Sequence, residues 1–301
     1  MKKFIIPQIS PDITIHQLNK RDFFIHQTIF DYRIKISSEL SNFISLIDNK
    51  KSLEEIIEEY NKVYHVKLPY DFAFQFLFTK LASYGIILNG TAGVFPNQKP
   101  NYLKLSFIVF SEQRVSILSQ KLHFLFAKKN IVIVIILSFI IGFYSLSNYN
   151  IYHTAISTSN WISFFILSFL SVTMHEFGHA SAAHHYGAKH GGIGGGFYLL
   201  MPVYFADVTD IWKLSKAQRI VVNFAGIYFE LIFVILIILT GLFLNMTEML
   251  VFGYLILLSS LRNLNPFIRS DGYWILSDTI EKPNLMYHSL NKLISFYCFM
   301  V

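Results

Sequence analysis

Two histidines flank a glutamate in the run His175-Glu176-Phe177-Gly178-His179. Residues four apart on a helix project about 40° from one another, so His175 and His179 can offer two imidazoles to one metal ion. Glu176 falls on the flank of that face. This is the H-E-x-x-H pattern, in which two histidines bind zinc and the glutamate, which is not a ligand, takes a proton from water. The alternative is a helix with two ordinary histidines.

The residues before this pattern favour a site in a membrane. No charged residue occurs from Trp161 to Thr173. Ionisable groups are costly in hydrocarbon, so those found there are functional candidates by default. We therefore expect the pattern inside a bilayer or just at its edge, and this setting weakens the alternative of two ordinary histidines.

The composition indicates an α-helical membrane protein. Of the 301 residues, 53% are hydrophobic and only 15% are charged, and the mean hydropathy is +0.45. The net charge of +6 does not indicate nucleic acid, because the basic residues cluster beside apolar runs, as they do at the cytoplasmic flanks of membrane helices. The single cysteine, Cys298, excludes an internal disulfide and a cysteine-rich zinc site. The basic start before Pro7 lacks the apolar core of a signal peptide.

Residues 1–95 differ from the rest of the chain in that polar and apolar residues are mixed. Their pattern predicts a small α+β domain of the winged helix-turn-helix type. Ser52 and Glu55 form a capping-box pattern at the start of one of its helices. The expected elements are strands at 21–27 and 30–36, helices at 38–47, 53–64 and 70–83, and a wing at 86–88 and 93–95. Residues 96–130 then form a linker and a juxtamembrane segment.

Residues 131–301 are expected to form the membrane domain, with about four membrane helices. Their approximate ranges are 131–146, 161–184, 220–244 and 249–264. Basic residues precede the first helix and place the N-terminal domain and the active-site side in the cytoplasm: Lys104, Arg114, Lys121, Lys128 and Lys129. The glycine cluster 191–196 predicts a re-entrant or β-like segment beside the site, with a flexible loop as the alternative.

A second constellation follows the fourth predicted helix. Pro266 removes a backbone donor and should break that helix. Asp271, five residues later, is then well placed to return to the histidines as a third, anionic zinc ligand, which leaves one coordination position open for water. Without the upstream pattern, an Asp-Gly pair after a proline is usually an ordinary turn.

The N-terminal region resembles the PqqD-like domains, which recognise ribosomally made peptides. The resemblance covers about residues 12–90 and lies in the pattern of "FDYRIKISSELSNFISLIDNKKSLEEIIEEY" and "FAFQFLFTKLASYGIIL". It implies that a precursor's leader binds as an added β-strand beside the third helix. DNA binding is the rival, but the helix expected at 70–83 carries Asp71 and only Lys80 as a base. A purely structural cap is a third possibility.

The pairing of H-E-F-G-H with N-P-F-x-x-x-D-G resembles the site-2 protease family of intramembrane zinc metalloproteases, over about residues 125–280. The resemblance implies His175, His179 and Asp271 as zinc ligands, Glu176 as general base and Asn265 as a polar contact to the substrate backbone or oxyanion. The family often has an asparagine after the glycine of its third helix, whereas Gly226 leads here to Glu230. That glutamate is expected either to replace the asparagine or to pair with a cation. His184 and His185 match no family ligand and are expected to be interfacial.

Three functions remain open on the sequence. The first is a zinc endopeptidase that recognises and cleaves a small precursor peptide at the membrane during maturation or export, with an export transporter as a candidate partner. The combination of a PqqD-like domain with this core is similar to the membrane peptidases of bacterial peptide-maturation operons. The second is regulated intramembrane proteolysis of a membrane-anchored regulator. The third is a non-catalytic binding or immunity protein, which has no need for Glu176. The final apolar run, 293–301, is too short to span a bilayer, so a truncated or naturally shortened chain is expected.

Overall fold

The computed structural model describes residues 5–18, 22–91, 93–94, 103–149, 158–198, 201–282 and 285–286. It consists of two compact units, Met1–Pro100 and Asn101–Val301. The final apolar run, 293–301, lies outside the described residues, as does the linker segment 95–102.

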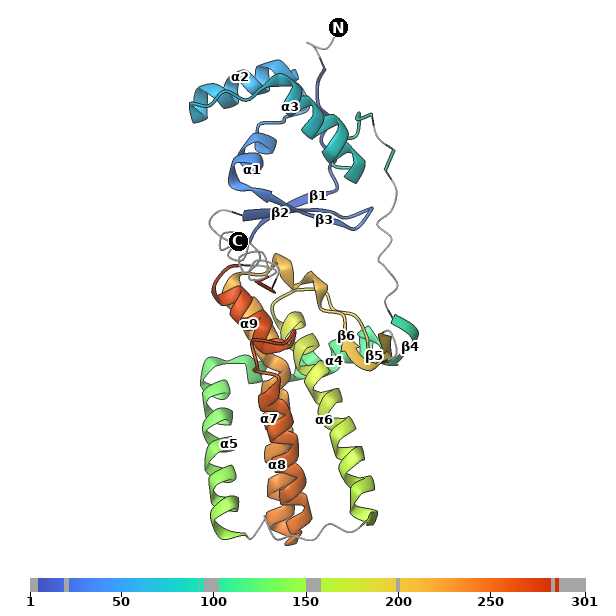
Figure 1. Ribbon diagram of the computed structural model, residues 1–301, viewed down its shortest axis with the longest axis vertical. Coiled ribbons are helices and arrows are strands. Elements are labelled where there is room, and N and C mark those ends of the chain that lie inside the picture. Colours follow the sequence, from blue (N-terminus) through green and yellow to red (C-terminus); the bar gives the residue numbers. More distant parts are fainter. Residues whose placement is uncertain are drawn as a thin grey trace, which may run out of the picture. The chain divides into compact units, whose positions relative to one another are not determined.

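The N-terminal unit is an antiparallel sheet, of order β1-β2-β3, with helices packed on it (Figure 1). Alternating apolar residues of β2 and β3 and one face of each helix enclose a single core around Ile25, Phe43, Leu53 and Leu77. Its elements are β1 (Ile13–Gln17), β2 (Asp22–Gln27), β3 (Tyr32–Ser37), α1 (Ser38–Ser45), α2 (Leu53–Tyr64) and α3 (Tyr70–Phe74), which continues as the π-helix η1 (Gln75–Leu81) and the 3₁₀-helix η2 (Ala82–Tyr84).

Most predicted elements of this unit are confirmed, but the wing is wrong where the structure describes it. Residues 86–88 form only an isolated bridge, between Ile87 and Ile9. Backbone hydrogen bonds join this segment to the start of the chain, from Ser10 to Ile86 and from Leu88 to Gln8. Residues 86–88 thus bond to the N-terminal segment and not to residues 93–94, which form no strand. Phe95, the last residue of the predicted wing, lies outside the described residues.

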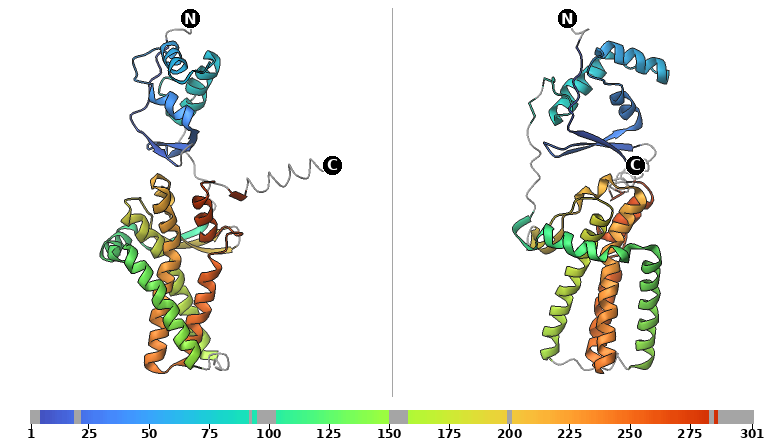
Figure 2. Two further views of the ribbon diagram at one scale, coloured as in Figure 1. Left: turned by 90° about the vertical axis from the view of Figure 1, so that its left-hand side faces the viewer. Right: turned by 180° about the vertical axis from the view of Figure 1, so that it is seen from behind.

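The second unit is a helical bundle with a small sheet at one end (Figures 1 and 2). α7 is its central helix and contacts α5, α6, α8 and α9. α4 lies across the ends of the bundle helices, at a steep angle to them. The elements are β4 (Leu103–Phe110), α4 (Glu112–Leu122), η3 (His123–Phe126), α5 (Lys128–Asn148), α6 (Thr158–His185), β5 (Ile193–Tyr198), β6 (Met201–Ala206), η5 (Thr209–Lys213), α7 (Lys216–Leu244), α8 (Thr247–Arg262) and α9 (Asp271–Thr279).

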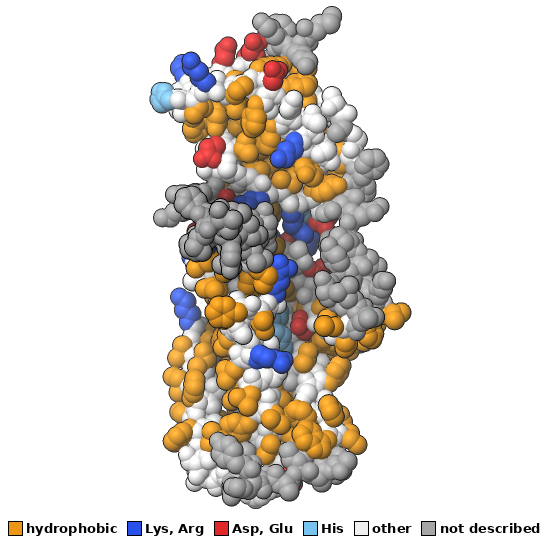
Figure 3. Space-filling model, viewed as in Figure 1, with side chains coloured by type: hydrophobic (Ala, Val, Ile, Leu, Met, Phe, Trp, Pro, Cys, Tyr) orange, Lys and Arg blue, Asp and Glu red, His pale blue; other side chains and the backbone are white. Residues whose placement is uncertain are grey.

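Three helices in the described part of the chain are long and apolar enough to cross a membrane, rather than the four expected. They are α5, α6 from Asn160 onward, and α7. The predicted span at 249–264 is α8, whose 16 residues reach only about 24 Å, less than a hydrocarbon core of about 30 Å. Large apolar side chains on the outside of the bundle are exposed, Phe139 by 74% and Phe165 by 67%, and Figure 3 shows hydrophobic side chains over its visible face.

The glycine cluster forms a strand, so the β-like alternative is confirmed and the flexible loop is wrong. β5 lies between β4 and β6 in an antiparallel sheet. Its glycines allow close packing: a Cβ at Gly194 would lie 2.1 Å from the carbonyl oxygen of Phe107 on β4. This sheet brings the end of β6, Ala206, to the face of α6 that carries Glu176.

Candidate metal centre

His175 and His179 project from the same face of α6 into the bundle, as their spacing predicts. Both are buried, at 8% exposure, and their Nε2 atoms lie 3.0 Å apart. The imidazole rings meet edge to face, with centroids 4.7 Å apart and an interplanar angle of 80°. The two histidines can therefore share one ion between their Nε2 atoms.

The position of these rings depends on a close crossing of α6 and α7. A Cβ at Gly178 would lie 2.3 Å from the carbonyl oxygen of Ala225, so only glycine lets the helices approach this closely. Gly226, next along α7, faces the histidines: its Cβ would lie 2.5 Å from the Nε2 of His179 and 2.7 Å from that of His175. The absent side chain leaves the space in which an ion would lie.

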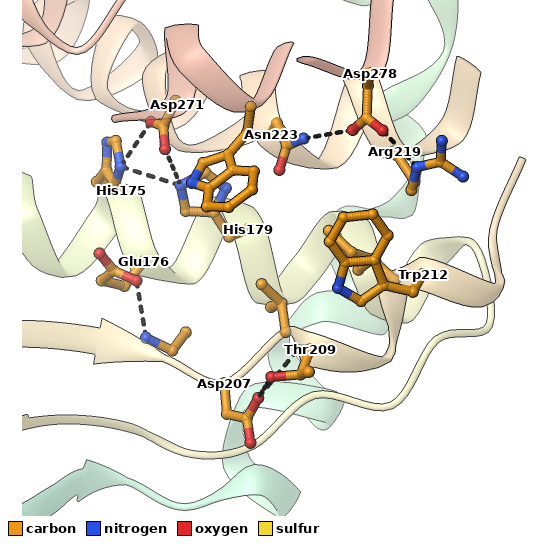
Figure 4. A pocket seen from close by; sticks show the side chains of 14 residues that line it. His175, Glu176, His179, Asp207, Thr209, Trp212, Arg219, Asn223, Asp271 and Asp278 are labelled. Carbon is orange, nitrogen blue, oxygen red and sulfur yellow. Dashed lines mark hydrogen bonds and ion pairs between the residues drawn. The ribbon is translucent and has the colours of Figure 1, made fainter. Parts of the chain in front are cut away.

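Asp271 reaches both histidines from the first turn of α9 (Figure 4). Its Oδ2 is 3.1 Å from the Nε2 of His175, and its Oδ1 is 3.4 Å from the Nε2 of His179. The chain leaves α8 at Arg262, as the position of Pro266 predicts, and Gly272 donates its N–H to the carbonyl of Asn263 across the turn. The three candidate ligands thus come from two helices, the two histidines from α6 and Asp271 from the first turn of α9.

The other nitrogen of each imidazole is held by an acceptor. His179 Nδ1 lies 2.8 Å from the carbonyl oxygen of Val222, which can only accept, so this nitrogen carries the proton. His175 Nδ1 lies 3.1 Å from Oε2 of Glu230. That carboxylate is buried, at 4% exposure, and also accepts from Ser260 and Ser171. Both Nε2 atoms are thus left with free lone pairs, as in carboxylate–histidine–zinc sites.

The donor set fits a zinc ion. Two Nε2 lone pairs and a carboxylate converge, with one ligand atom of each residue within 4.8 Å of the others. Asp271 Oδ2 is buried, and with both imidazoles in this tautomer it has no hydrogen-bond donor among the described residues. Such a cluster is repulsive without a cation between its members. Two histidines and one carboxylate with an open fourth position are a common catalytic zinc set.

When no metal is bound and the two histidines are protonated, their charge keeps the carboxyl of Asp271 ionised. Burial raises the pKa of Asp271, but the hydrogen bonds and charges of protonated His175 and His179 outweigh burial and hold the pKa well below the usual range of an aspartic acid. An ionised carboxylate is the form that binds a metal ion.

Glu176 and the three candidate ligands line one cavity of about 370 Å³ (Figure 4). The Oε2 of Glu176 accepts the N–H of Ala206 on β6, at 2.8 Å. This bond fixes the carboxylate on the β6 side of the cavity. The cavity continues from these residues to Trp212 and Trp274 and to the ion pair of Arg219 and Asp278.

Asn265 is not brought to this cavity. Its side chain is exposed and accepts the N–H of Phe267 within the turn, at 2.9 Å. Another asparagine, Asn223 on α7, lines the cavity and was not singled out from the sequence. The signal for it is spacing: Arg219, Asn223, Gly226 and Glu230 recur at four, three and four residues, which places all of them on one face of α7.

A buried ion pair fastens α9 to α7. Arg219 Nε lies 2.7 Å from Asp278 Oδ1, with side chains exposed by only 4% and 11%, and Asn223 donates to the other oxygen. Burial raises the pKa of Asp278, and the interactions with Arg219 and Asn223 lower this pKa by less than burial raises it. Asp278 is two helical turns after Asp271 and so lies on the same face of α9. The pair therefore helps to hold Asp271 against the histidines.

We expect Arg219→Met to destabilise the protein by about 3–5 kcal/mol, because it leaves Asp278 buried and unpaired. The double variant Arg219→Met/Asp278→Leu should recover most of this loss, since no charge is left without a partner. Thermal unfolding in detergent measures both. Lys216→Met is the matched control: it removes an exposed pair between α7 and Glu281, just after α9, and should change little. Equal losses in Arg219→Met and Lys216→Met would contradict the role of burial.

We expect Glu230→Gln to weaken zinc binding by about 10- to 100-fold, because an amide holds the Nδ1 proton of His175 less strongly than a carboxylate does. Competition with a chromophoric chelator measures the affinity. Thr240→Val is the control. Thr240 is exposed on the same helix, and its hydroxyl donates to the carbonyl of Leu236. An unchanged affinity in Glu230→Gln would show that Glu230 does not support His175.

No family model and no solved structure matches the chain. The chain is similar to a Bacillus subtilis (strain 168) protein described as "Putative peptide zinc metalloprotease protein YydH", with 27% identity over 119 residues, 38% of this chain and 47% of the relative. The chain thus matches about half the length of that relative. This distant and partial similarity supports a metalloprotease-like protein, and the cluster of His175, His179 and Asp271 is compatible with a metal.

Proposed function

We propose that the chain is a membrane-embedded zinc endopeptidase that cleaves a small ribosomally made precursor peptide during maturation or export. The observation that carries the proposal is the convergence of His175, His179 and Asp271 in the cavity that Glu176 also lines. A purely structural cluster has no need for an additional carboxylate beside an open ligand position.

The residues of the chain divide the chemistry between them. His175, His179 and Asp271 would hold a zinc ion, which would supply a Lewis acid that lowers the pKa of water to about 7. Glu176 takes the proton of the attacking water and later gives it to the leaving amine. Glu230 and the carbonyl of Val222 fix the imidazoles in the tautomer that leaves Nε2 free. Asn265 remains a candidate substrate contact, once its bond to Phe267 opens.

The N-terminal unit is proposed to recognise the precursor. Among the described residues, β3 is an outer strand of its sheet, and an outer strand can accept an extended peptide as a further strand. The basic residues before and at the start of α5 favour a cytoplasmic position for this unit and for the active-site side. The substrate would then reach the membrane from the cytoplasm, beside an export transporter.

Co-expression with a candidate precursor peptide tests the proposal. Mass spectrometry should detect a shortened precursor with the wild-type chain and only the intact precursor with Glu176→Ala. Identical processing with both chains would overturn the enzymatic function. A neighbouring reading frame for a short peptide would identify the first substrate to use.

Deletion of residues 1–95 separates recognition from chemistry. We expect the shortened chain to lose binding to a soluble leader peptide and to lose cleavage of the precursor that carries it. Unaltered cleavage of a membrane-anchored substrate by the shortened chain would favour regulated intramembrane proteolysis instead, with the N-terminal unit controlling access.

A further inference from the structure

Four of the eleven histidines gather beyond the candidate zinc centre, at the end of α6. His184 and His185 end that helix, His123 begins η3, and His190 precedes β5. The centroid of the His123 ring lies 5.4 Å from that of His184 and 4.9 Å from that of His185, and the rings of His184 and His190 are 5.5 Å apart. The sequence predicted only an interfacial location for His184 and His185 and did not predict their contacts with His123 and His190.

The hydrogen bonds of the cluster are unequal. His190 has a partner at each nitrogen, the hydroxyl of Ser116 at 3.1 Å and the carbonyl of Gly191 at 2.9 Å. By contrast, Nε2 of His123 and Nδ1 of His185 are buried and have no hydrogen-bond partner among the described residues. Buried polar atoms nearly always have one, so two such nitrogens on neighbouring rings require an explanation.

The rings of this pair have nearly the same centroid distance and interplanar angle as those of the candidate zinc pair. The rings of His123 and His185 meet at an interplanar angle of 79° with centroids 4.9 Å apart, compared with 80° and 4.7 Å for His175 and His179. Imidazole nitrogen is a ligand suited to zinc, copper and nickel. An ion bound between the rings would give each unpartnered nitrogen a bond.

We propose that His123 and His185 form a second transition-metal site, with His184 as an adjacent third ligand. The site is less preformed than the first, because in the described part of the chain only His175, His179 and Asp271 have three ligand atoms within 4.8 Å of one another. A rotation of the His184 side chain would bring it to the ion. Since η3 leads into α5, an ion here would tie the start of α5 to the end of α6, where His185 lies about 9 Å along the helix from His179.

Metal stoichiometry of the purified full chain tests this site without any need for protease activity. Elemental analysis after equilibration with Co²⁺ should give two ions per wild-type chain. His123→Phe and His185→Phe, which keep a ring in contact with its neighbours, should each give one. His190→Gln is the matched control, since its nitrogens are already paired, and should keep two ions.

Asp271→Ala distinguishes this inference from the proposed function. It should lower the stoichiometry from two to one, and a further His185→Phe should lower it to none. A wild-type chain that binds one ion, lost in Asp271→Ala but kept in His185→Phe, would overturn the second site and leave the active centre intact. One ion that is lost in His185→Phe but kept in Asp271→Ala would support the second site and count against the first.

Discussion

Glu176→Gln is expected to slow peptide hydrolysis by about 10²- to 10⁴-fold, the loss that follows removal of a general base. The amide can still accept the N–H of Ala206, so the side chain should keep its place, and zinc content should not change because Glu176 is not among the candidate ligands. Cleavage kinetics of a precursor, with zinc measured on the same sample, give both quantities.

Glu248→Gln provides the matched control for this substitution. Glu248 lies in the first turn of α8 and so at the opposite end of that helix from the turn that leads to Asp271. The Glu248→Gln substitution makes the same change of charge in the same unit and should leave the rate of hydrolysis unchanged. Full activity in Glu176→Gln would remove Glu176 from the mechanism, and loss of zinc in that variant would place it among the ligands.

Gly226→Ala is expected to weaken zinc binding by at least about 10- to 100-fold. The added methyl group would lie 2.5 Å and 2.7 Å from the two Nε2 atoms that face the ion, where no side chain can be accommodated without moving the rings. The result should be a chain that contains little zinc and hydrolyses little peptide. Metal analysis and chelator competition measure the first loss, and precursor cleavage the second.

Gly142→Ala makes the same chemical change in another long apolar helix, α5. The nearest atom to its Cβ, the hydroxyl oxygen of Tyr254, is 3.8 Å away, which is ordinary van der Waals contact. It should preserve zinc content and activity. If Gly226→Ala bound zinc as tightly as Gly142→Ala does, the space beside Gly226 would have no role in metal binding.

Local sequence signals predicted the elements whose ends depend on local bonds. The range of α2 is confirmed at both ends, since the capping box of Ser52 and Glu55 fixes its start. The break after α8 is likewise confirmed, since a proline acts on its own backbone. The meeting of Asp271 with the two histidines also follows the sequence prediction, because the motifs restricted which residues can share an ion.

Elements that depend on distant partners were missed. β4 pairs with β5, which lies more than eighty residues later in the chain. The residues around 103–110 therefore give no local signal for a strand. The wing at 86–88 was lost for the same reason, because Ile87 pairs with Ile9. Spacing places Asn223 on the same face of α7 as Gly226 and Glu230, but its bond to Asp278 depends on the packing of α9 against α7, which no local signal predicts. The side chain of Asn265, in contrast, is used by the turn that contains it.

Because the candidate ligands are divided between α6 and α9, they are synthesised at different times. The ribosome completes both histidines long before it adds Asp271 and the residues that dock α9 on α7. At about 5–20 residues per second, the nascent chain has only two of the three candidate ligands for several seconds. If metal binding needs all three, the centre is incomplete during this interval, and it stays incomplete in a chain that fails to dock α9 on α7.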